Sequence, residues 1–423
     1  MKLGFIIMQA IKHYKSKIER VFITFIQKII LVLKRLTPKP IKVIINKIIN
    51  YGEHKIIAHN QAKLYELLEQ YHAEKDYRAL IIFPPSLDWE VQLFQRPQQL
   101  ALALANQGAL VFYIQPKPDR KQEPFRRIID RLYLCNVHVD TFRVFNNPYI
   151  YLLTWNSDYA SRFRNPQIIY DFVDDIDVFY GDKKQIRKGH EYLLKNAKIV
   201  LATASKLVEE AKGFRKDVIY SPNGVVYDHF AHSSSKNDFT PPPDLLPLLQ
   251  KKKPIIGYYG ALARWFDYEL LKNAANLRKE YQFVLIGPDY DGTLDPAGIY
   301  RYKNIYWLGV KQYKELPEYL HYFDVATIPF IVNEITHATS PLKLFEYMAG
   351  GKPIVVTPMR ESMQYEGVLV ANGPDEFVEK LDQAIILSRD SQYINQIKKL
   401  ALQNTWESRA EDIITNIESF TLI

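Results

Sequence analysis

Short runs of apolar residues recur along the chain beyond residue 78, and stretches with helical hydrophobic spacing separate them. Apolar runs bounded by turn residues are typical of buried strands. They lie at residues 79–83, 109–114, 168–170, 198–202 and 218–220, and then at 254–259, 282–286, 305–308, 325–328 and 353–357. A regular alternation of strand and helix predicts parallel sheets with helices on both faces. We therefore expect an α/β protein with two doubly wound, Rossmann-like domains.

The two series of strands are separated by a stretch rich in Ser, Pro and Lys that lacks sustained periodicity. Such composition is typical of a linker between domains. The expected organisation is an N-terminal extension, a first domain, a linker, a second domain and a final helix. The corresponding residues are 1–75, 76–235, 236–253, 254–404 and 405–423.

The extension has its own hydrophobic pattern. Apolar residues follow helical spacing over residues 18–36 and again over 41–49, and Pro38 and Pro40 stand between the two stretches. The pattern over residues 56–77 then predicts a more polar helix. Lys28 interrupts the longest apolar run before it reaches the length of a spanning helix, and no small-residue cleavage site follows. We expect neither a transmembrane span nor a signal peptide.

The distribution of charge along the chain indicates what this extension binds. Residues 1–50 hold eleven Lys or Arg and one Glu, a net charge of +10, whereas the whole chain has +8, so the remainder carries −2. Basic amphipathic helices bind anionic membrane surfaces, and nothing in the body of the protein suggests nucleic acid binding. An alternative is that the helices pack on the body or on another subunit. The single cysteine, Cys135, suits a reducing cytosol, so the expected location is cytoplasmic, at the inner face of the cell membrane.

The stretch from Ser340 to Val356 carries the clearest chemistry. Ser340 is expected to cap a helix, Pro341 to occupy its first position, and Gly350 and Gly351 to end it. Lys343 and Glu346 are three residues apart and so share one face near the N-terminus of this helix. A helix N-terminus favours an anion such as a diphosphate, and a carboxylate can accept hydrogen bonds from a ribose diol. The alternative is that Lys343 and Glu346 merely pair on a surface helix.

These residues resemble the donor-site helix of retaining glycosyltransferases with the GT-B fold, the bacterial "glycosyl transferases group 1" type. In that family two glutamates are separated by seven residues, and the second one, matching Glu346, holds the nucleotide ribose. The small residues and the Lys before it lie near the diphosphate, and the donor-binding positions this implies are Thr339, Ser340, Pro341 and Leu342, with Lys343. The chain departs from the pattern at the first glutamate, whose place is taken by Ala338. The contact to the donor sugar is therefore absent or is supplied by Thr336, His337 or Thr339.

Two other turns of the second domain fit a donor site. Gly260 and Ala261 follow a strand, where small side chains let a phosphate approach the backbone. Arg264 comes next in the same loop, and Gly287 follows the next strand. The resemblance implies that Gly260 and Arg264 neutralise the departing diphosphate, and that the final helix crosses back to the first domain.

Polar residues also follow strands of the first domain, where doubly wound sheets bind ligands. Ser86, Asp88, Trp89 and Arg96 come after the first strand, and the run from Phe94 to Ala101 resembles the opening of one bacterial branch of the family. We expect these four residues on the acceptor side. Asp171, Asp174 and Asp175 are expected just beyond a later strand, with Asp174 or Asp175 as the acceptor-side base or hydroxyl ligand and solvated loop acids as the alternative.

The sequence thus predicts a glycosyltransferase, of hexosyltransferase type and retaining by resemblance. It would move a sugar from a nucleotide diphosphate sugar to a saccharide or lipid-linked acceptor in bacterial cell-envelope polysaccharide or glycolipid synthesis. Catalytic roles are assigned to Asp174, Asp175, Arg264 and Lys343, with no cofactor and no metal. Two alternatives stay open: a non-hydrolysing nucleotide-sugar epimerase, and a non-catalytic degenerate transferase that acts as a scaffold.

Overall fold

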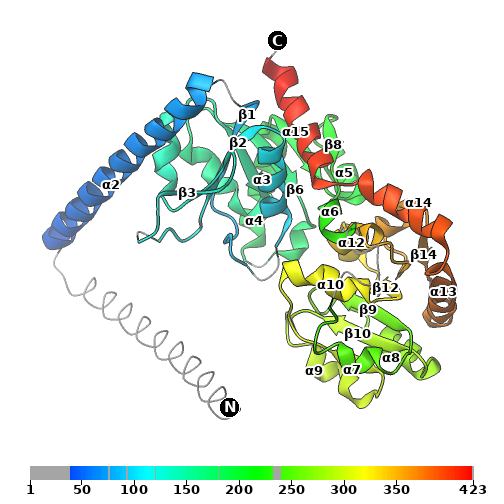
Figure 1. The fold of residues 1–423 in the computed structure, drawn as a ribbon. Coiled ribbons are helices and arrows are strands. Elements are labelled where there is room, and N and C mark those ends of the chain that lie inside the picture. Colours follow the sequence, from blue (N-terminus) through cyan, green and yellow to red (C-terminus); the bar gives the residue numbers. More distant parts are fainter. Residues whose placement is uncertain are drawn as a thin grey trace. The chain divides into compact units, whose positions relative to one another are not determined.

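The computed structural model describes residues 39–74, 77–91, 94–119, 121–179, 181–231 and 240–421. Two sheets organise the chain from residue 64 onward (Figure 1). The first is formed by residues 79–220 and the second by residues 255–370. The predicted α/β class with two parallel doubly wound sheets is confirmed.

The first sheet has eight strands in the order β3-β4-β2-β1-β5-β6-β7-β8. Among the described strands of this sheet, β3 and β4 pair in antiparallel fashion, and every other neighbouring pair is parallel. The strands are β1 (Ala79–Phe83), β2 (Ala109–Ile114), β3 (Phe125–Ile129), β4 (Leu132–Cys135), β5 (Tyr149–Leu153), β6 (Gln167–Phe172), β7 (Ile199–Ala202) and β8 (Val218–Tyr220). β3, β4 and β5 are additional to the strands that the apolar runs predict.

Both faces of this sheet are buried. Side chains alternate between the faces, so that Ile82 and Phe112 enter one core cluster while Ile81 and Val111 enter the other. The covering helices are α3 (Arg96–Asn106), α4 (Lys183–Asn196), α5 (Ser205–Lys212) and α15 (Trp406–Thr421), with 3-10 turns η1 (Val139–Val144), η2 (Thr154–Arg162) and η3 (Ile176–Val178). Burial on both sides explains why most of these strands read as continuous apolar runs.

The second sheet has six parallel strands in the order β11-β10-β9-β12-β13-β14. They are β9 (Ile255–Tyr259), β10 (Gln282–Ile286), β11 (Ile305–Trp307), β12 (Val325–Ile328), β13 (Ile354–Val356) and β14 (Val368–Val370). The order reverses between β9 and β12, which is the doubly wound pattern in which ligands bind beyond the carboxyl ends of the strands.

Helices cover both faces of this second sheet and connect its strands. They are α6 (Tyr227–Ala231), α7 (Leu246–Leu249), α8 (Tyr268–Leu277), α9 (Leu294–Ala297), α10 (Leu316–His321), α11 (Glu334–His337), α12 (Leu342–Ala349), α13 (Pro374–Leu387) and α14 (Ser391–Leu402). Three short 3-10 turns are η4 (Ile299–Arg301), η5 (Tyr313–Glu315) and η6 (Ser362–Gln364).

The chain enters the second domain earlier than the expected boundary at residue 235. Val225 and Phe230 are fully buried in the core of the second domain, and Leu245 and Leu248 of the expected linker join the same core. The described part of that linker is therefore packed structure that contains α7, because its leucines bury against β9 and its neighbours.

The last helix returns to the first domain. Trp406, Ile413 and Ile414 of α15 are fully or almost fully buried in the same cluster as Leu100 of α3 (Figure 1, α15 in red). The apolar face of α15 thus closes one side of the first sheet after the chain has completed the second domain.

One helix, α2 (Lys39–Glu74), replaces the two separate helices expected at 41–49 and 56–77. Pro40 lies in its first turn, where the missing N–H has no cost. Leu64, Leu68 and Tyr71 pack into the core of the first domain, and the Tyr71 and Tyr133 hydroxyls lie 2.9 Å apart. Residues 1–38, with the helix predicted at 18–36, lie outside the described residues. No helix in the described part of the chain has the length and apolarity needed to cross a bilayer.

Candidate active site

A cavity of about 280 Å³ lies where the carboxyl ends of strands from both sheets meet. The first domain lines it with residues at or after the ends of β5, β6 and β7 and at the start of α3. The second domain contributes the turns after β9 and β10, the residues around η5 and the start of α12. The site therefore lies at the crevice that the strand orders predict. Its polar and aromatic lining includes Asp174, Thr203, Tyr259, Lys311, Tyr313, Ser340, Lys343 and Glu346.

The start of the helix α12 differs from the expectation at Ser340. The helix begins at Leu342 with Pro341 as its N-cap, and no side chain caps it. Instead, the Ser340 hydroxyl oxygen accepts a hydrogen bond from the Asn223 backbone N–H at 3.1 Å, and the Asn223 Nδ2 donates to the Ser340 carbonyl at 2.7 Å. Ser340 thus fixes the helix to the turn that joins the two domains, and the first N–H groups of α12 keep no side-chain partner.

Lys343 occupies the space left by the absent side chain of Gly260. A Cβ at Gly260 would lie 2.7 Å from Lys343 Cε, so any side chain at this position would force the end of the lysine to shift. The Lys343 Nζ lies 5.0 Å from the Phe330 ring centroid and 5.4 Å from that of Tyr258. Burial lowers the pKa of Lys343 to about 8, against the raising effect of Glu346. The surface ion pair considered for Lys343 and Glu346 is not formed within the described chain.

Glu346 lies one turn deeper and is only 2% exposed. Its Oε1 and the hydroxyls of Tyr259 and Tyr313 are buried and have no hydrogen-bond partner among the described residues. Burial raises the pKa of Glu346 to about 7, and the nearby Tyr259 and Lys343 oppose that rise. Unpartnered buried polar atoms are costly and rare. The Tyr259 hydroxyl lies close enough to Glu346 to lower its pKa, and the three groups together leave hydrogen-bonding capacity for a ligand that offers hydroxyl groups.

Gly287 brings the turns after β9 and β10 together. Its φ is +137°, and a Cβ there would lie 1.9 Å from the Gly260 carbonyl oxygen. Gly260, with a φ of +139°, is likewise in a region that favours glycine. Both glycines and Ala261 line the cavity. Their smallness serves close backbone packing around Lys343, in addition to the phosphate access expected from the sequence.

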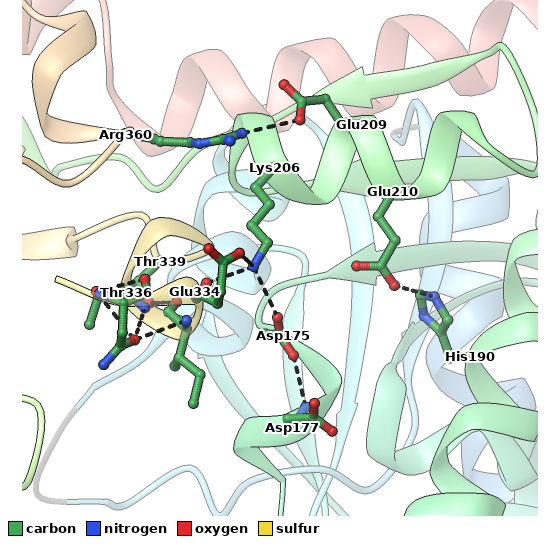
Figure 2. Close-up of polar contacts among 12 residues, drawn as sticks. Asp175, Asp177, His190, Lys206, Glu209, Glu210, Glu334, Thr336, Thr339 and Arg360 are labelled. Carbon is green, nitrogen blue, oxygen red and sulfur yellow. Dashed lines mark hydrogen bonds and ion pairs between the residues drawn. The ribbon is translucent and has the colours of Figure 1, made fainter.

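The acidic cluster after β6 divides into three environments. Asp171 was expected beyond the strand, but β6 extends to Phe172, so Asp171 lies within the strand and is fully buried. Asp174 lines the cavity, and burial together with Asp175 and Asp171 raises its pKa to about 7. Asp175 points away from the cavity lining towards Lys206, at 3.5 Å (Figure 2).

Lys206 links Asp175 to the loop before α12. Its Nζ lies 2.7 Å from the Glu334 carboxylate and donates to the Glu334 carbonyl at 2.8 Å (Figure 2). Glu361 adds a second connection between the domains, since it accepts hydrogen bonds from the Ser205 N–H and the Tyr220 hydroxyl, both at 2.6 Å. These contacts hold the two walls of the cavity together.

Arg96 lines the cavity, but its donors bind acceptors of the protein. Nε donates to Asp171 at 2.6 Å and the NH2 group to the other Asp171 oxygen at 3.1 Å, which makes a buried bidentate pair. Further bonds reach the Pro222 carbonyl and the Ser221 hydroxyl, each at 3.1 Å. Arg96 therefore supports the interdomain turn that in turn holds Ser340 and α12.

Several expected site residues do not line the cavity. Ser86, Asp88 and Trp89 are absent from its lining, and Trp89 packs edge-on against Phe94 and Tyr113. Arg264 is exposed in the turn after β9, and its backbone N–H donates to Asp291 at 2.9 Å.

The residues just before α12 also point elsewhere. The Thr339 hydroxyl donates to the Ile335 carbonyl at 3.1 Å; Figure 2 labels Thr336 and Thr339. The Thr336 hydroxyl donates to the carbonyls of Ile331 and Asn333. Ala338, at the place of the first family glutamate, is fully buried with the core cluster of the first domain. A glutamate there would have to bury a charge against apolar neighbours.

The cavity also includes residues that no sequence pattern singled out. Asn223 lies in the turn between the two domains and holds the start of α12 through Ser340. Tyr259 ends a buried strand, and Tyr313 lies in a polar stretch remote in sequence. The signal that could have found Asn223 and Tyr259 was their position at strand ends.

The comparisons with known proteins agree with this geometry. Residues 253–386 match the family model described as "Glycosyl transferases group 1". Solved structures of similar fold include sucrose-phosphate synthase from Thermosynechococcus elongatus, at a TM-score of 0.61 and 16% identity, covering 81% of this chain and 99% of that one. Another is Anabaena HepE in complex with UDP-glucose, at 0.58 and 15%, covering 80% and 99%. The chain has the GT-B fold. The resemblance to bacterial GT-B glycosyltransferases is thereby confirmed.

One relative comes from the curated proteins. The chain is 26% identical over 235 residues to a protein of Bacillus subtilis strain 168 provisionally named as the teichuronic acid biosynthesis glycosyltransferase TuaH. The match covers 53% of this chain and 57% of that relative. The chain therefore matches little more than half the length of this relative.

Proposed function

We propose that this protein is a glycosyltransferase of bacterial polysaccharide biosynthesis that takes its sugar from a nucleotide diphosphate sugar. The observation that carries the proposal is the set of buried groups without partners around Glu346, beside a half-buried lysine at the start of α12. The family match of the second domain and the name of the Bacillus subtilis relative support the same reaction class.

The donor is held by the second domain. Its diphosphate lies against Lys343 and the first N–H groups of α12, where a helix N-terminus favours negative charge. Glu346 accepts hydrogen bonds from the ribose hydroxyls, which gives its unpartnered Oε1 a donor. A bound diphosphate stabilises the protonated Lys343, so donor binding opposes the lowering of its pKa by burial.

The acceptor approaches from the first domain. Asp174 lies on that wall of the cavity with a pKa raised to about 7, close to the value that suits a general base at neutral pH. In the transfer step the acceptor hydroxyl loses its proton to Asp174 and its oxygen bonds to the anomeric carbon. The bond from that carbon to the diphosphate oxygen breaks, and Lys343 stabilises the negative charge that develops on the leaving group. Neither Asp175 nor Arg264 is needed for this assignment.

The donor to test first carries UDP, because the HepE structures are complexes with UDP-glucose and with UDP and glucose. A hexose is the corresponding sugar. Retention of configuration follows the family and requires the acceptor oxygen to bond to the anomeric carbon on the face that the diphosphate leaves. NMR of the anomeric proton in the product tests it independently of the donor assignment.

The acceptor is proposed to be membrane-linked. The support is the net charge of +10 within residues 1–50, which favours attachment to an anionic bilayer at the cytoplasmic face. A full chain in which Lys2, Lys12, Lys15 and Lys17 are changed to Gln would then bind phosphatidylglycerol vesicles less than the wild type. Equal binding would exclude the role of this segment.

The experiment for the reaction supplies radiolabelled UDP-hexoses to the full chain with and without a membrane fraction of a polysaccharide-producing bacterium. A labelled polymer or lipid that depends on the membrane fraction and disappears in Asp174→Asn supports the transferase. Conversion of the nucleotide sugar without any acceptor would instead indicate an epimerase. If no donor is consumed and no nucleotide binds, the remaining interpretation is a non-catalytic scaffold.

A further inference from the structure

A second hollow lies at the opposite edge of the second sheet. It has a volume of about 720 Å³ and is formed at the amino ends of β9, β10 and β11. Gln282 lies at the start of β10, whereas Gly287 follows the end of the same strand and lines the donor cavity. Five residues of strand span about 16 Å, so the two sites are separate.

Of the residues that the structure describes, five cationic side chains and no carboxylate line this hollow, which we name the basic hollow. The cations are Lys251, Lys253, Lys279, Arg301 and Lys303. None of them forms an ion pair with a carboxylate of the described residues. Like charges gathered without counter-ions repel one another, and an anion bound among them removes that cost.

Neutral partners position three of the four lysines of the basic hollow. Lys251 Nζ donates to the Tyr306 hydroxyl at 2.8 Å, and that hydroxyl donates to the Lys303 carbonyl at 2.7 Å. Lys253 Nζ donates to the Lys279 carbonyl at 3.0 Å, and Lys279 Nζ to the Asn276 side-chain oxygen at 2.8 Å. Each ammonium keeps further N–H donors for a ligand. The basic hollow is therefore a set of exposed donors, three of which are held in place by neutral partners.

A buried acceptor complements these donors. Gln282 is 1% exposed, and its Nε2 donates to the carbonyls of Leu248 at 3.0 Å and Lys253 at 3.2 Å. Its Oε1 is buried and has no partner among the described residues. An amide oxygen requires a hydrogen-bond donor, which a fully ionised anion does not offer. A hydroxyl group on the ligand, besides its negative charge, would supply that donor.

We infer that the basic hollow binds the phosphate ester of a polyol. The phosphate oxygens accept from the lysines and Arg301, and a polyol hydroxyl donates towards Gln282. The same chemistry occurs in a soluble polyol phosphate and in the headgroup of phosphatidylglycerol. The site lies apart from the donor cavity, so this inference does not depend on the proposed activity.

Calorimetry of the full chain with glycerol 1-phosphate at low ionic strength tests the inference. The double variant Lys253→Gln/Lys303→Gln should bind about tenfold more weakly than the wild type, since the two ammonium groups supply part of the binding free energy. The control Lys212→Gln/Lys216→Gln removes the same charge from exposed positions of the first domain and should bind like the wild type. Lys343→Met should also leave this binding unchanged.

The inference is wrong if glycerol 1-phosphate does not bind, or if the variant of the basic hollow and the control bind equally. Loss of binding in Lys343→Met alone would place the ligand in the donor cavity and overturn it as well. Once binding is found, vesicles of phosphatidylcholine with about 30% phosphatidylglycerol distinguish its source. Weaker vesicle binding by the variant than by the control indicates the lipid headgroup, and equal binding indicates the soluble ester.

Discussion

Lys343 Cε lies where a side chain at Gly260 would be, 2.7 Å from the ideal position of a Cβ. The long side chain of one residue thus fills the space that a glycine more than eighty positions away leaves open. The match places the ammonium at the carboxyl edge of the second sheet, next to the first turn of α12.

The first prediction concerns Gly260→Ala. The added Cβ displaces Lys343, and the φ of +139° is strained for alanine. Donor binding should fall about tenfold, with a loss of stability of roughly 1–2 kcal/mol. Gly292→Ala is the matched control, because Gly292 has a φ of +77° and nothing within 4 Å of its Cβ position. Calorimetric titration of both variants separates displacement of Lys343 from backbone strain; equal loss of binding would refute the displacement.

The second prediction concerns the stability of Glu346→Gln. The pKa of Glu346 is about 7 in the folded protein and near 4.5 in the unfolded chain, so the wild type loses stability as pH rises from about 4.5 to about 7. The loss reaches at most about 3 kcal/mol. Glutamine does not ionise, so the variant should gain stability over the wild type between pH 4.5 and pH 8.

Urea denaturation at the two pH values measures this difference. Glu379→Gln, an exposed position on α13, is the control and should follow the wild type. A difference between Glu346→Gln and the wild type that is the same at pH 4.5 and pH 8 would contradict the raised pKa.

The third prediction is a pH profile. If Asp174 takes the acceptor proton, kcat/KM rises with pH through about 7, because only the carboxylate can accept it. Asp175→Asn removes a charge that raises the pKa of Asp174, so the rising limb should move to lower pH. Asp177→Asn in the same loop is the control, since Asp177 pairs with Arg187 and is exposed. If Asp175→Asn does not shift the pH profile of kcat/KM, a group other than Asp174 determines its rising limb.

The fourth prediction concerns the buried pair of Arg96 and Asp171. Arg96→Met leaves the fully buried Asp171 without its cation, which costs about 3–5 kcal/mol. The double variant Arg96→Met/Asp171→Leu should recover part of that stability, because no uncompensated charge remains. Arg126→Met breaks an exposed pair with Glu90 and should cost less than about 1 kcal/mol. If Arg96→Met unfolds no more readily than Arg126→Met, the Arg96–Asp171 pair does not make the expected contribution to the free energy of unfolding.

Much of the fold was predictable because strands that are buried on both faces of a sheet appear in the sequence as continuous apolar runs. The runs at 79–83 and 282–286 coincide with β1 and β10. β3 was not predicted, because its residues are mostly half-buried and include Arg126 and Arg127 at the sheet edge. The helix α2 runs through both of its predicted parts because no proline stands between them.

The site was less predictable, since it depends on which strand ends meet. Lys343 and Glu346 could be selected because their spacing on a helix is local. The pairing of Arg96 with Asp171 joins residues 75 positions apart, and the hydrogen bonds of Asn223 with Ser340 join residues 117 apart. Linear order does not reveal such contacts, so Arg96 was expected to face a ligand and Asn223 was not selected.

The most direct test of the donor site is calorimetric binding of UDP, GDP, ADP and CDP to the full chain, repeated with Lys343→Met and Glu346→Gln. We predict that one nucleoside diphosphate binds the wild type. Lys343→Met should weaken the binding of that diphosphate far more than the binding of the corresponding nucleoside. Glu346→Gln should weaken the binding of both, since Glu346 holds the ribose. Absence of binding for all four nucleotides, or binding that neither variant changes, would contradict the donor site at the start of α12.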